Sequence, residues 1–170
     1  MIMIDKINFF FSRNGFTRGK ILKKKKYLKF CGDNVFFQPR KIPSDAKLVS
    51  LGNNVVIASQ VVFINHDVMH HVFNNIEKHS TSYHMGKIEI GDNVFIGANT
   101  ILFPNIKISD NVIIAAGSHV YKDINQSGVY AGIPLKKIKE FEKVFEVRKK
   151  EHSMNKDLSR EEIIKQIWKS

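Results

Sequence analysis

A six-residue period runs through residues 88–134 and constrains the fold more than any other feature of this chain. Aliphatic side chains recur at every sixth position, and apolar or small residues precede each of them by two. The first set is Ile90, Ile96, Leu102, Ile108, Ile114 and Val120, and the second is Ile88, Val94, Thr100, Ile106, Val112 and Ser118. This period fits neither a lone amphipathic helix nor a long strand. It predicts short strands wrapped around a narrow prism, with inward side chains sharing one core.

A corner signature recurs four times and sets the length of one coil. It reads CGDNVFF at 31–37, LGNNVVI at 51–57, IGDNVFI at 90–96 and ISDNVII at 108–114. Gly, Asp and Asn tolerate the left-handed backbone region, so each copy predicts a corner followed by a strand. Gly91 and Ser109 are 18 residues apart, which corresponds to three six-residue sides. Gly32 and Gly52 are 20 apart, which indicates a bulge near Pro39 to Pro43.

The period breaks between the second and third corners. Residues 63–87 read FINHDVMHHVFNNIEKHSTSYHMGK and contain five of the seven histidines. Loops longer than about 12–15 residues are uncommon in compact domains and are often functional. We therefore expect a protruding loop at about 66–87, with His66 at the exit of a rigid coil.

The two ends differ from the repeat. Residues 1–30 mix phenylalanines with a lysine run, and we interpret them as a basic, aromatic segment that caps the open end of the prism. A second interpretation is a peripheral contact with anionic lipid at the inner membrane face. After Pro134, apolar residues at helical spacing predict a helix, and Ser159 with Glu162 forms a capping-box signature for a last one. The predicted parts are 1–30, a β-helix domain at 31–133 and a helical extension at 134–170.

Composition limits the partners and the compartment. The net charge of +11 favours an anionic partner, but the basic residues cluster at the two ends and no nucleic-acid-binding motif occurs, so nucleic acid is not expected. No apolar run is long enough to span a membrane, and the first residues lack a signal cleavage site. The single cysteine, Cys31, falls on an inward position, which favours a core role. We expect a cytoplasmic protein that is peripheral to the membrane at most.

The segments GDNVFIGANTILFPNIKISDNVIIAAGSHVYKDI and AGIPLKKIKE resemble the C-terminal half of the hexapeptide-repeat acyltransferases. Those enzymes are trimeric left-handed parallel β-helices that transfer acetyl from acetyl-CoA, and they include sugar and polysaccharide O-acetyltransferases. The resemblance covers roughly residues 29–141. It implies an all-β solenoid, a left-handed parallel β-helix of about four coils with C-terminal α-helices, and a homotrimer with active sites between adjacent prisms.

The resemblance also assigns site residues. The family's catalytic histidine follows the coil before the loop, which matches Asn65-His66. Its coenzyme contacts come from small residues at coil corners and from basic residues after the prism. Here these are Ala98, Ala115, Ala116, Tyr121, Lys122, Lys136 and Lys139. Tyr121 departs from the small hydroxyl residue common there. Lysine at 136 and 139 replaces the arginine of some relatives, and lysine cannot form arginine's bidentate phosphate contact.

Acetyl transfer to a hydroxyl requires a base, and neutral histidine suits this role at cytoplasmic pH. His66 is the expected general base, the Asn65 amide or a backbone N–H is a candidate for the oxyanion, and Asp67 or Glu77 are candidates to orient the imidazole. The loop is the expected acceptor-binding element, through Asp67, Phe73, Tyr83 and His84; packing against a neighbouring subunit is an equal alternative. His79 and His84 raise the question of a metal, but they lie outside the coils, and we expect none.

The expected function is acetyl-CoA-dependent O-acetylation of a sugar hydroxyl, in capsular, exopolysaccharide or lipopolysaccharide biosynthesis. N-acetylation of an amino sugar and acetylation of a streptogramin-type antibiotic are alternatives within the enzyme class. A non-catalytic β-helix scaffold that binds an anionic partner is the alternative outside it.

Overall fold

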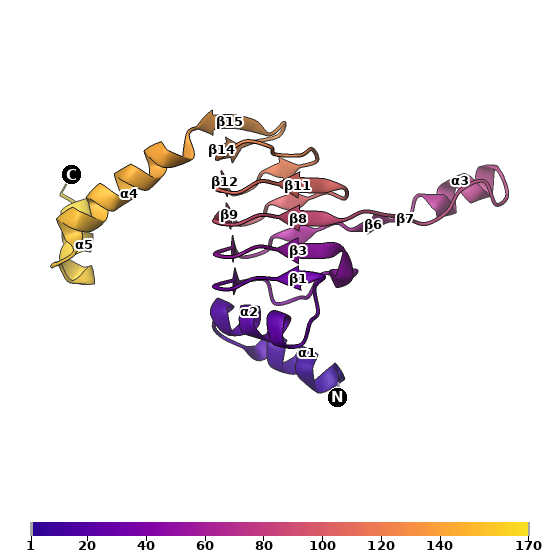
Figure 1. Ribbon diagram of the computed structural model, residues 1–170, viewed down its shortest axis with the longest axis horizontal. Helices are drawn as coiled ribbons and strands as arrows, with labels where there is room; N and C mark the ends of the chain where they lie inside the picture. Colours follow the sequence, from indigo (N-terminus) through magenta and orange to yellow (C-terminus); the bar gives the residue numbers. More distant parts are fainter. Residues whose placement is uncertain (1, 170) are drawn as a thin grey trace.

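The computed structural model describes residues 2–169, and side-chain environments from residue 7 onward. Its centre is a parallel β-helix whose strands stack in three faces (Figure 1). The strands are β1 (Phe30–Cys31), β2 (Phe36–Phe37), β3 (Val49–Leu51), β4 (Val56–Ile57), β5 (Val62–Phe63), β8 (Ile88–Ile90), β9 (Val94–Ile96), β10 (Ile101–Leu102), β11 (Ile106–Ile108), β12 (Val112–Ile114), β13 (His119–Val120) and β14 (Gly128–Ala131). Face A has the order β1-β3-β8-β11, face B begins β2-β4-β9-β12-β14, and face C is β5-β10-β13.

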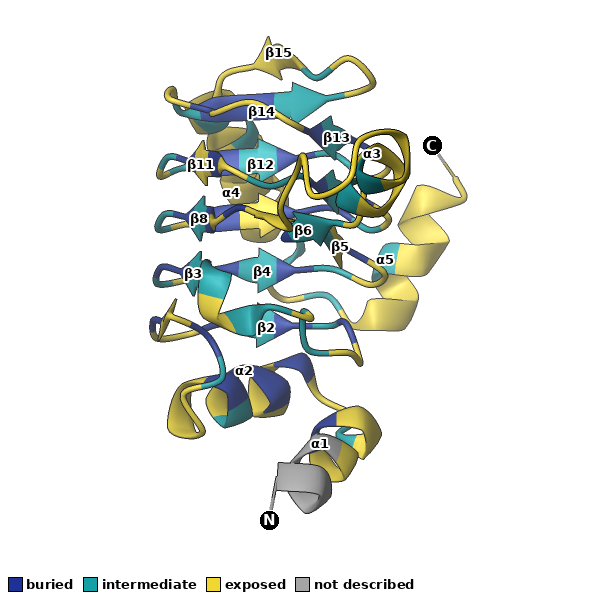
Figure 2. Ribbon diagram, turned by 90° about the vertical axis from the view of Figure 1, so that its right-hand side faces the viewer, coloured by how far each residue is buried: buried dark blue, intermediate teal, exposed yellow. Residues whose placement is uncertain are grey.

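The inward positions form the core, as the six-residue period predicts. Every member of both predicted inward sets is buried, including the polar residues Thr100 and Ser118 (Figure 2). The two hydroxyls are satisfied inside the prism, because both donate to the carbonyl oxygen of Ala115. Parallel pairing places like residues over like residues, for example Ile90 between Leu51 and Ile108. Each buried isoleucine or leucine contributes about 1.5–3 kcal/mol to folding.

The four predicted corners join face A to face B and carry an asparagine ladder. Asn34, Asn54, Asn93 and Asn111 all adopt positive φ, between 54° and 56°. Their amides stack, since each side-chain Nδ2 donates to the Oδ1 of the next asparagine at 3.0–3.1 Å. Asn53, Asp92 and Asp110, which precede three of these asparagines, add a second ladder, because each side-chain oxygen accepts a backbone N–H of the coil below. The corner signature is therefore a turn that also binds its neighbours along the prism axis.

Two helices close the N-terminal end of the prism. They are α1 (Ile2–Phe11) and α2 (Gly15–Lys24), and α2 lies directly under the first coil (Figures 1 and 2). At Gly19 the contact is so close that an added Cβ would lie 2.0 Å from the Val35 carbonyl oxygen. Phe9 and Leu22 are buried in the core cluster, and the Phe9 and Phe37 ring centroids are 6.0 Å apart. The described residues 2–30 thus cover the first coil through both helices.

Residues 38–48 replace the third side of the first coil. They leave β2, include a short 3₁₀ helix (η1, Ala46–Leu48) and return at β3, so face C has no strand at this level. The predicted bulge near Pro39 to Pro43 lies within this insertion.

The C-terminal segment begins differently from the prediction. A helix starting at Pro134 is wrong, because β15 (Lys136–Lys139) pairs antiparallel with β14 and covers its open edge. The helix α4 (Phe141–Asn155) follows, and α5 (Arg160–Ile167) begins at the predicted capping box of Ser159 and Glu162. Both helices extend away from the prism (Figure 1). None of the helices described between residues 2 and 169 is long and apolar enough to cross a membrane.

Candidate active site

An arm projects from the prism where the period breaks. It leaves after β5, contains β6 (His66–Asp67), α3 (His70–Ile76) and β7 (His84–Met85), and returns at β8 (Figure 1). β6 and β7 form an antiparallel pair that opposes His66 to Met85 and Asp67 to His84. The Asp67 carboxylate accepts the Met69 N–H at 3.0 Å and so turns the chain into α3. The arm is therefore a short hairpin with a helix at its tip.

His66 lies at the base of the arm and is held by Asp45. Its Nδ1 is hydrogen-bonded to Oδ2 of Asp45, a residue of the 38–48 insertion one coil below. The two side chains are about one third exposed, 30% for His66 and 33% for Asp45. A carboxylate only accepts hydrogen bonds, so Nδ1 carries the proton and Nε2 presents a lone pair. An imidazole oriented in this way can remove a proton from a bound hydroxyl group.

Tyr83 covers the other side of the imidazole. The ring centroids of Tyr83 and His66 are 5.2 Å apart, and His70 meets Tyr83 edge-on at 5.6 Å. Loss of solvent, and then the carboxylates of Asp45 and Asp67, raise the pKa of the Tyr83 hydroxyl. The phenol thus remains a neutral hydrogen-bond donor beside His66 under physiological conditions.

The arm separates the predicted acceptor residues onto two faces. Successive residues of a strand point in opposite directions, so His66 and Asp67 face opposite sides of the hairpin. Asp67, Phe73 and His84 line a hollow of about 550 Å³ that is bounded on the prism side by Phe103. Tyr83 lies on the side of His66 instead. The four residues therefore do not form one cluster in the single chain.

Asn65 precedes His66 in the chain, and its side chain faces inward. It is 2% exposed, and neither its side-chain Oδ1 nor its Nδ2 has a hydrogen-bond partner among the described residues. Its backbone oxygen accepts the Gly86 N–H at 2.7 Å and closes the root of the arm. An unsatisfied buried amide costs about 1–3 kcal/mol, so the Asn65 side chain in this position lowers the free energy of unfolding.

The alanines predicted to contact the coenzyme lie at one corner, between face B and face C. Ala98 belongs to the turn after β9, and Ala115 and Ala116 belong to the turn directly above it. The turns are in close contact, since a Cβ added at Gly97 would lie 2.4 Å from the backbone nitrogen of Ala116. Small side chains leave this corner flat, which permits close approach of an extended ligand to the backbone.

The other predicted coenzyme residues lie elsewhere on the prism. Tyr121 and Lys122 are at the corner between face C and face A, above the root of the arm, where Tyr121 meets Phe103 at 6.4 Å and the Lys122 Nζ lies 6.0 Å from the Tyr121 ring centroid. Lys136 and Lys139 are on β15, and both are exposed. Face C thus separates the alanine corner from Tyr121 and Lys122.

The residue missed by the sequence interpretation is Asp45. Asp67, one of the two candidates to orient the imidazole, instead accepts the Met69 N–H just before α3, and Glu77 lies at the far end of that helix. Its position in the sequence could have pointed to it. Asp45 is the one carboxylate in residues 38–48, and it lies about one coil before His66. Stacking of coils brings such a residue under the root of the arm.

Cys31, for which the sequence predicts a core role, is buried in the described structure. Burial, opposed by Lys23 and assisted by Asp33, raises the pKa of the Cys31 thiol to about 11, so it is a poor nucleophile. Its sulfur contacts the Gly19 carbonyl oxygen at 3.9 Å inside the cap. Residues 2–169 contain no group of three or more His, Cys, Asp or Glu side chains arranged to hold a metal.

Known proteins share both the repeat and the fold. The family described as bacterial transferase hexapeptide (six repeats) matches residues 87–122. Protein CapG of Staphylococcus aureus is 43% identical over 99 residues, 58% of this chain and 56% of CapG. The putative acetyltransferase YvoF of Bacillus subtilis is 31% identical over 135 residues, 79% of this chain and 68% of YvoF. A solved galactoside acetyltransferase in complex with coenzyme A superposes with a TM-score of 0.59 at 26% identity, covering 82% of this chain and 78% of that one. The chain thus spans a little over half of the length of CapG and about two thirds of the length of YvoF.

Proposed function

Because this chain belongs to the bacterial hexapeptide-repeat transferases, we propose that it transfers the acetyl group of acetyl-CoA to a hydroxyl group of a saccharide. The observation that carries this proposal is the His66–Asp45 pair, in which Asp45 binds Nδ1 and no side chain of the described residues 7–169 binds Nε2 at the root of the arm. A base of this kind contributes about 10²–10⁴-fold to the rate of such reactions. Similarity to a galactoside acetyltransferase solved with coenzyme A supports the donor and the class of acceptor.

In the proposed reaction His66 moves one proton. Nε2 accepts the proton of the acceptor hydroxyl as its oxygen attacks the thioester carbonyl carbon. The carbon–sulfur bond then breaks, and the imidazolium returns the proton to the departing thiolate of coenzyme A. Asp45 acts as a positioning residue that fixes the tautomer and stabilises the transient imidazolium. The Tyr83 hydroxyl is a candidate donor to the oxyanion, and the Asn65 amide becomes one only if the root of the arm opens.

The coenzyme is proposed to lie along face C, between the alanine corner and Tyr121. The flat stack of Ala98, Ala115 and Ala116 suits the extended pantetheine chain. Lys122, Lys136 and Lys139 are proposed to bind the phosphates as single-point cations, each without arginine's paired contact. No metal takes part in this proposal.

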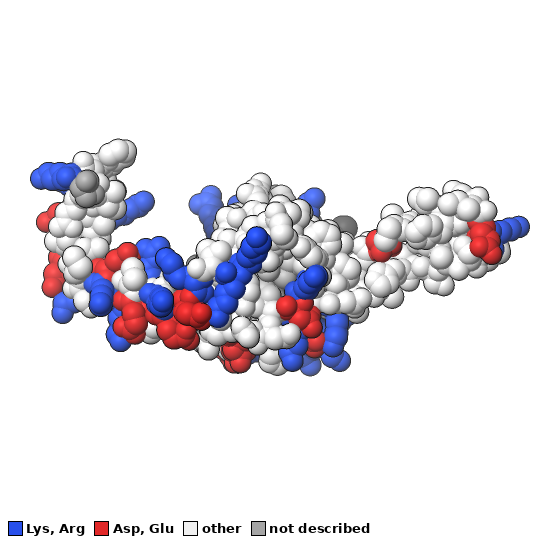
Figure 3. All heavy atoms as spheres, turned by 90° about the horizontal axis from the view of Figure 1, so that it is seen from above, with Lys and Arg blue, Asp and Glu red and all other residues white. Residues whose placement is uncertain are grey.

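A homotrimer is proposed as the working form. The arm supports it, because Val72 and Ile76 are 60% and 81% exposed, and in Figure 3 most of the arm is uncharged, with acidic atoms partway along it and charged atoms of both signs at its tip. An apolar surface that projects into water favours a partner, and a second prism would place the arm beside the alanine corner of its neighbour. Light scattering that finds a monomer at assay concentrations would contradict this arrangement.

We place the reaction in surface-polysaccharide biosynthesis, within capsular polysaccharide, exopolysaccharide or lipopolysaccharide assembly, with the N-terminal end facing the inner membrane. Similarity to a galactoside O-acetyltransferase supports a saccharide acceptor, and the basic, aromatic composition of residues 1–30 supports the position at the membrane.

The decisive assay is release of coenzyme A thiol from acetyl-CoA in the presence of a saccharide panel. Mass spectrometry and NMR of the product identify the acetylated atom. An O-acetyl ester is expected; acetylation of an amino sugar nitrogen would replace the proposed reaction by N-acetyl transfer. Failure to bind acetyl-CoA in calorimetry would favour a non-catalytic scaffold.

A further inference from the structure

Face C carries one histidine in an outer row that is otherwise aliphatic. Its three strands pair in register, which places Val62, Ile101 and His119 above one another on the outer side of the face. Val62 is 48% exposed, and the other two side chains are partly buried. Aliphatic, β-branched residues suit such positions of a strand, so the imidazole is the one departure in this row.

The His119 imidazole has no polar partner in the part of the chain that the structure describes. It forms no side-chain hydrogen bond or ion pair with residues 7–169, and its ring nitrogens are not buried. Its ring lies beside that of Phe103, with 5.8 Å between the centroids. An imidazole carries one donor and one acceptor nitrogen when neutral, and two donors when protonated. His119 therefore presents hydrogen-bonding groups to a ligand on a surface that is otherwise apolar.

His119 lies in the middle of the path proposed for the coenzyme. On its coil, the alanine corner is at one side of face C and Tyr121 is at the other. Ser118 and Val120 point inward and are buried, so His119 is the outer residue between the two corners. A chain that follows face C from the lysines of β15 to the root of the arm passes this side chain.

The height of His119 on the prism selects the part of the coenzyme that meets it. Neighbouring strands of a sheet lie about 4.8 Å apart, so His119 lies about 10 Å above Val62, whose strand leads to His66. In extended pantetheine, the amide farther from sulfur begins about seven bonds, or roughly 9 Å, from the sulfur atom. With the thioester at His66, this amide reaches the level of His119.

We infer that His119 is a donor-binding residue, whose imidazole hydrogen-bonds the pantetheine amide farther from sulfur. This inference rests on the acetyl-transfer function proposed above. Ile101 and Val62, below His119, contact the methylene groups of the same chain. The row thus binds pantetheine through one polar and two apolar positions, and a donor without this amide gains nothing from the histidine.

Three donors separate this role from a structural one. Acetyl-CoA and S-acetylpantetheine both carry the farther amide, whereas S-acetyl-N-acetylcysteamine carries only the nearer one. His119→Ile continues the aliphatic row, and His119→Gln restores a donor and an acceptor. His152→Ala removes an imidazole from α4, away from face C, and is the matched control. Thiol release gives kcat and KM for each donor, with a saccharide that the parent chain accepts.

His119→Ile should lower kcat/KM about 3–10-fold with acetyl-CoA and S-acetylpantetheine, mainly through KM, because one neutral hydrogen bond is lost. It should leave kcat/KM with S-acetyl-N-acetylcysteamine unchanged. His119→Gln should recover part of the loss, and His152→Ala should equal the parent with all three donors. An equal loss with all three donors, or no loss with any of them, would overturn the inference.

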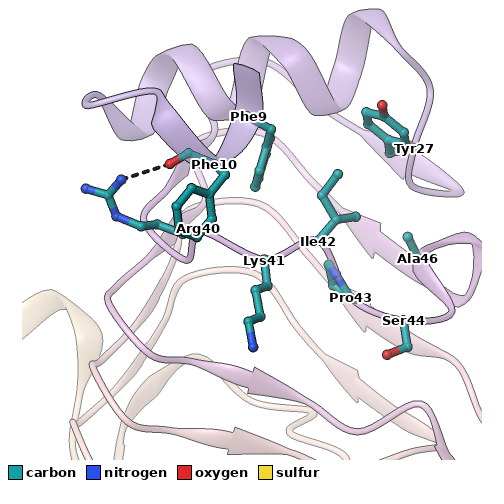
Figure 4. A pocket seen from close by; sticks show the side chains of 9 residues that line it. All are labelled: Phe9, Phe10, Tyr27, Arg40, Lys41, Ile42, Pro43, Ser44 and Ala46. Carbon is teal, nitrogen blue, oxygen red and sulfur yellow. Dashed lines mark hydrogen bonds between the residues drawn. The ribbon is translucent and has the colours of Figure 1, made fainter. Parts of the chain in front are cut away.

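The cations at the opposite end of the prism supply a test of the direction of the coenzyme. Figure 4 shows Arg40 and Lys41 beside a hollow at the N-terminal cap, with the Lys41 amine extending out of it. Calorimetry of coenzyme A, and of adenosine diphosphate as a ligand without pantetheine, requires no turnover. Lys41→Ala should change neither affinity, and His119→Ile should weaken the binding of coenzyme A alone. Weaker binding of both ligands in Lys41→Ala, with no change in His119→Ile, would place the phosphates at the cap and overturn the inference.

The two measurements also distinguish this inference from the proposed function. If His119→Ile weakens the binding of coenzyme A but no saccharide is acetylated by the parent chain, the donor site stands and the proposed transfer fails. If the parent chain acetylates a saccharide and His119→Ile matches it with every donor, the proposed function stands and this inference alone fails.

Discussion

Replacing Asp45 by asparagine tests the proposed His66–Asp45 catalytic pair without removing the imidazole. The substitution keeps the size of the side chain and a carbonyl oxygen for the Nδ1 proton of His66, but it removes the negative charge. Two unit charges about 4 Å apart interact by roughly 4 kcal/mol at an effective dielectric constant near 20. The pair is about one third exposed, so solvent screening reduces the stabilisation of the imidazolium to about 2 kcal/mol. Because 1.4 kcal/mol is a factor of ten, kcat should fall roughly 30-fold.

The assay must separate positioning from folding. Thiol-release kinetics should show the loss in kcat with little change in the KM for acetyl-CoA, and the melting temperature should move by only a few degrees, because a partly exposed pair adds at most about 1 kcal/mol to stability. His66→Ala and the double variant complete a cycle. If Asp45 acts through His66, the double variant is no slower than His66→Ala alone. The positioning role would be refuted if the loss of kcat in the double variant equalled the product of the losses in the two single variants. An unchanged kcat in Asp45→Asn would refute it as well.

Three further predictions concern the stability of variants at two buried residues, Asn65 and Cys31, and at one corner residue, Asn93. Asn65→Leu removes an unsatisfied buried amide, so denaturant unfolding should show a gain of about 1 kcal/mol or more; if the amide also serves the reaction, kcat falls in the same variant. The Cys31 thiol has a pKa raised to about 11 in the folded chain, from 9.0, so the free energy of unfolding should fall by about 2–3 kcal/mol as pH rises through 9 to 11. Cys31→Ala should lose less over that range, and identical pH curves would contradict the assignment. Asn93→Ala should cost about 1–3 kcal/mol, because it removes contacts to Asn54 and Asn111 and places alanine at a φ of 56°; an unchanged unfolding midpoint would show that the ladder does not stabilise the prism.

The repetitive part of the fold was predictable because its residues act locally. Ile90 and its successors at every sixth position are buried as predicted, and the Asp-Asn corners adopt the positive φ that their side chains tolerate. The similarity to solved relatives confirms the predicted left-handed parallel β-helix. The handedness came from the resemblance, since periodicity carries no information on chirality.

The parts that failed depend on contacts distant in sequence. Leu135 and Ile138 have helical spacing, yet the open edge of β14 captures this segment as a strand. Asp45 meets His66 only because the coils stack, and nothing near His66 in the chain points to it. Likewise, the division of Asp67 and Tyr83 between opposite faces of the arm follows from the β6–β7 pairing, which the irregular sequence of residues 63–87 does not reveal.

The most direct test of the central claim is the turnover of His66→Ala with acetyl-CoA and an accepted saccharide, together with calorimetric binding of acetyl-CoA. The variant should bind acetyl-CoA as the parent chain does, and its kcat should fall about 10²–10⁴-fold. A kcat equal to that of the parent, with acetyl-CoA bound, would show that His66 is not the base.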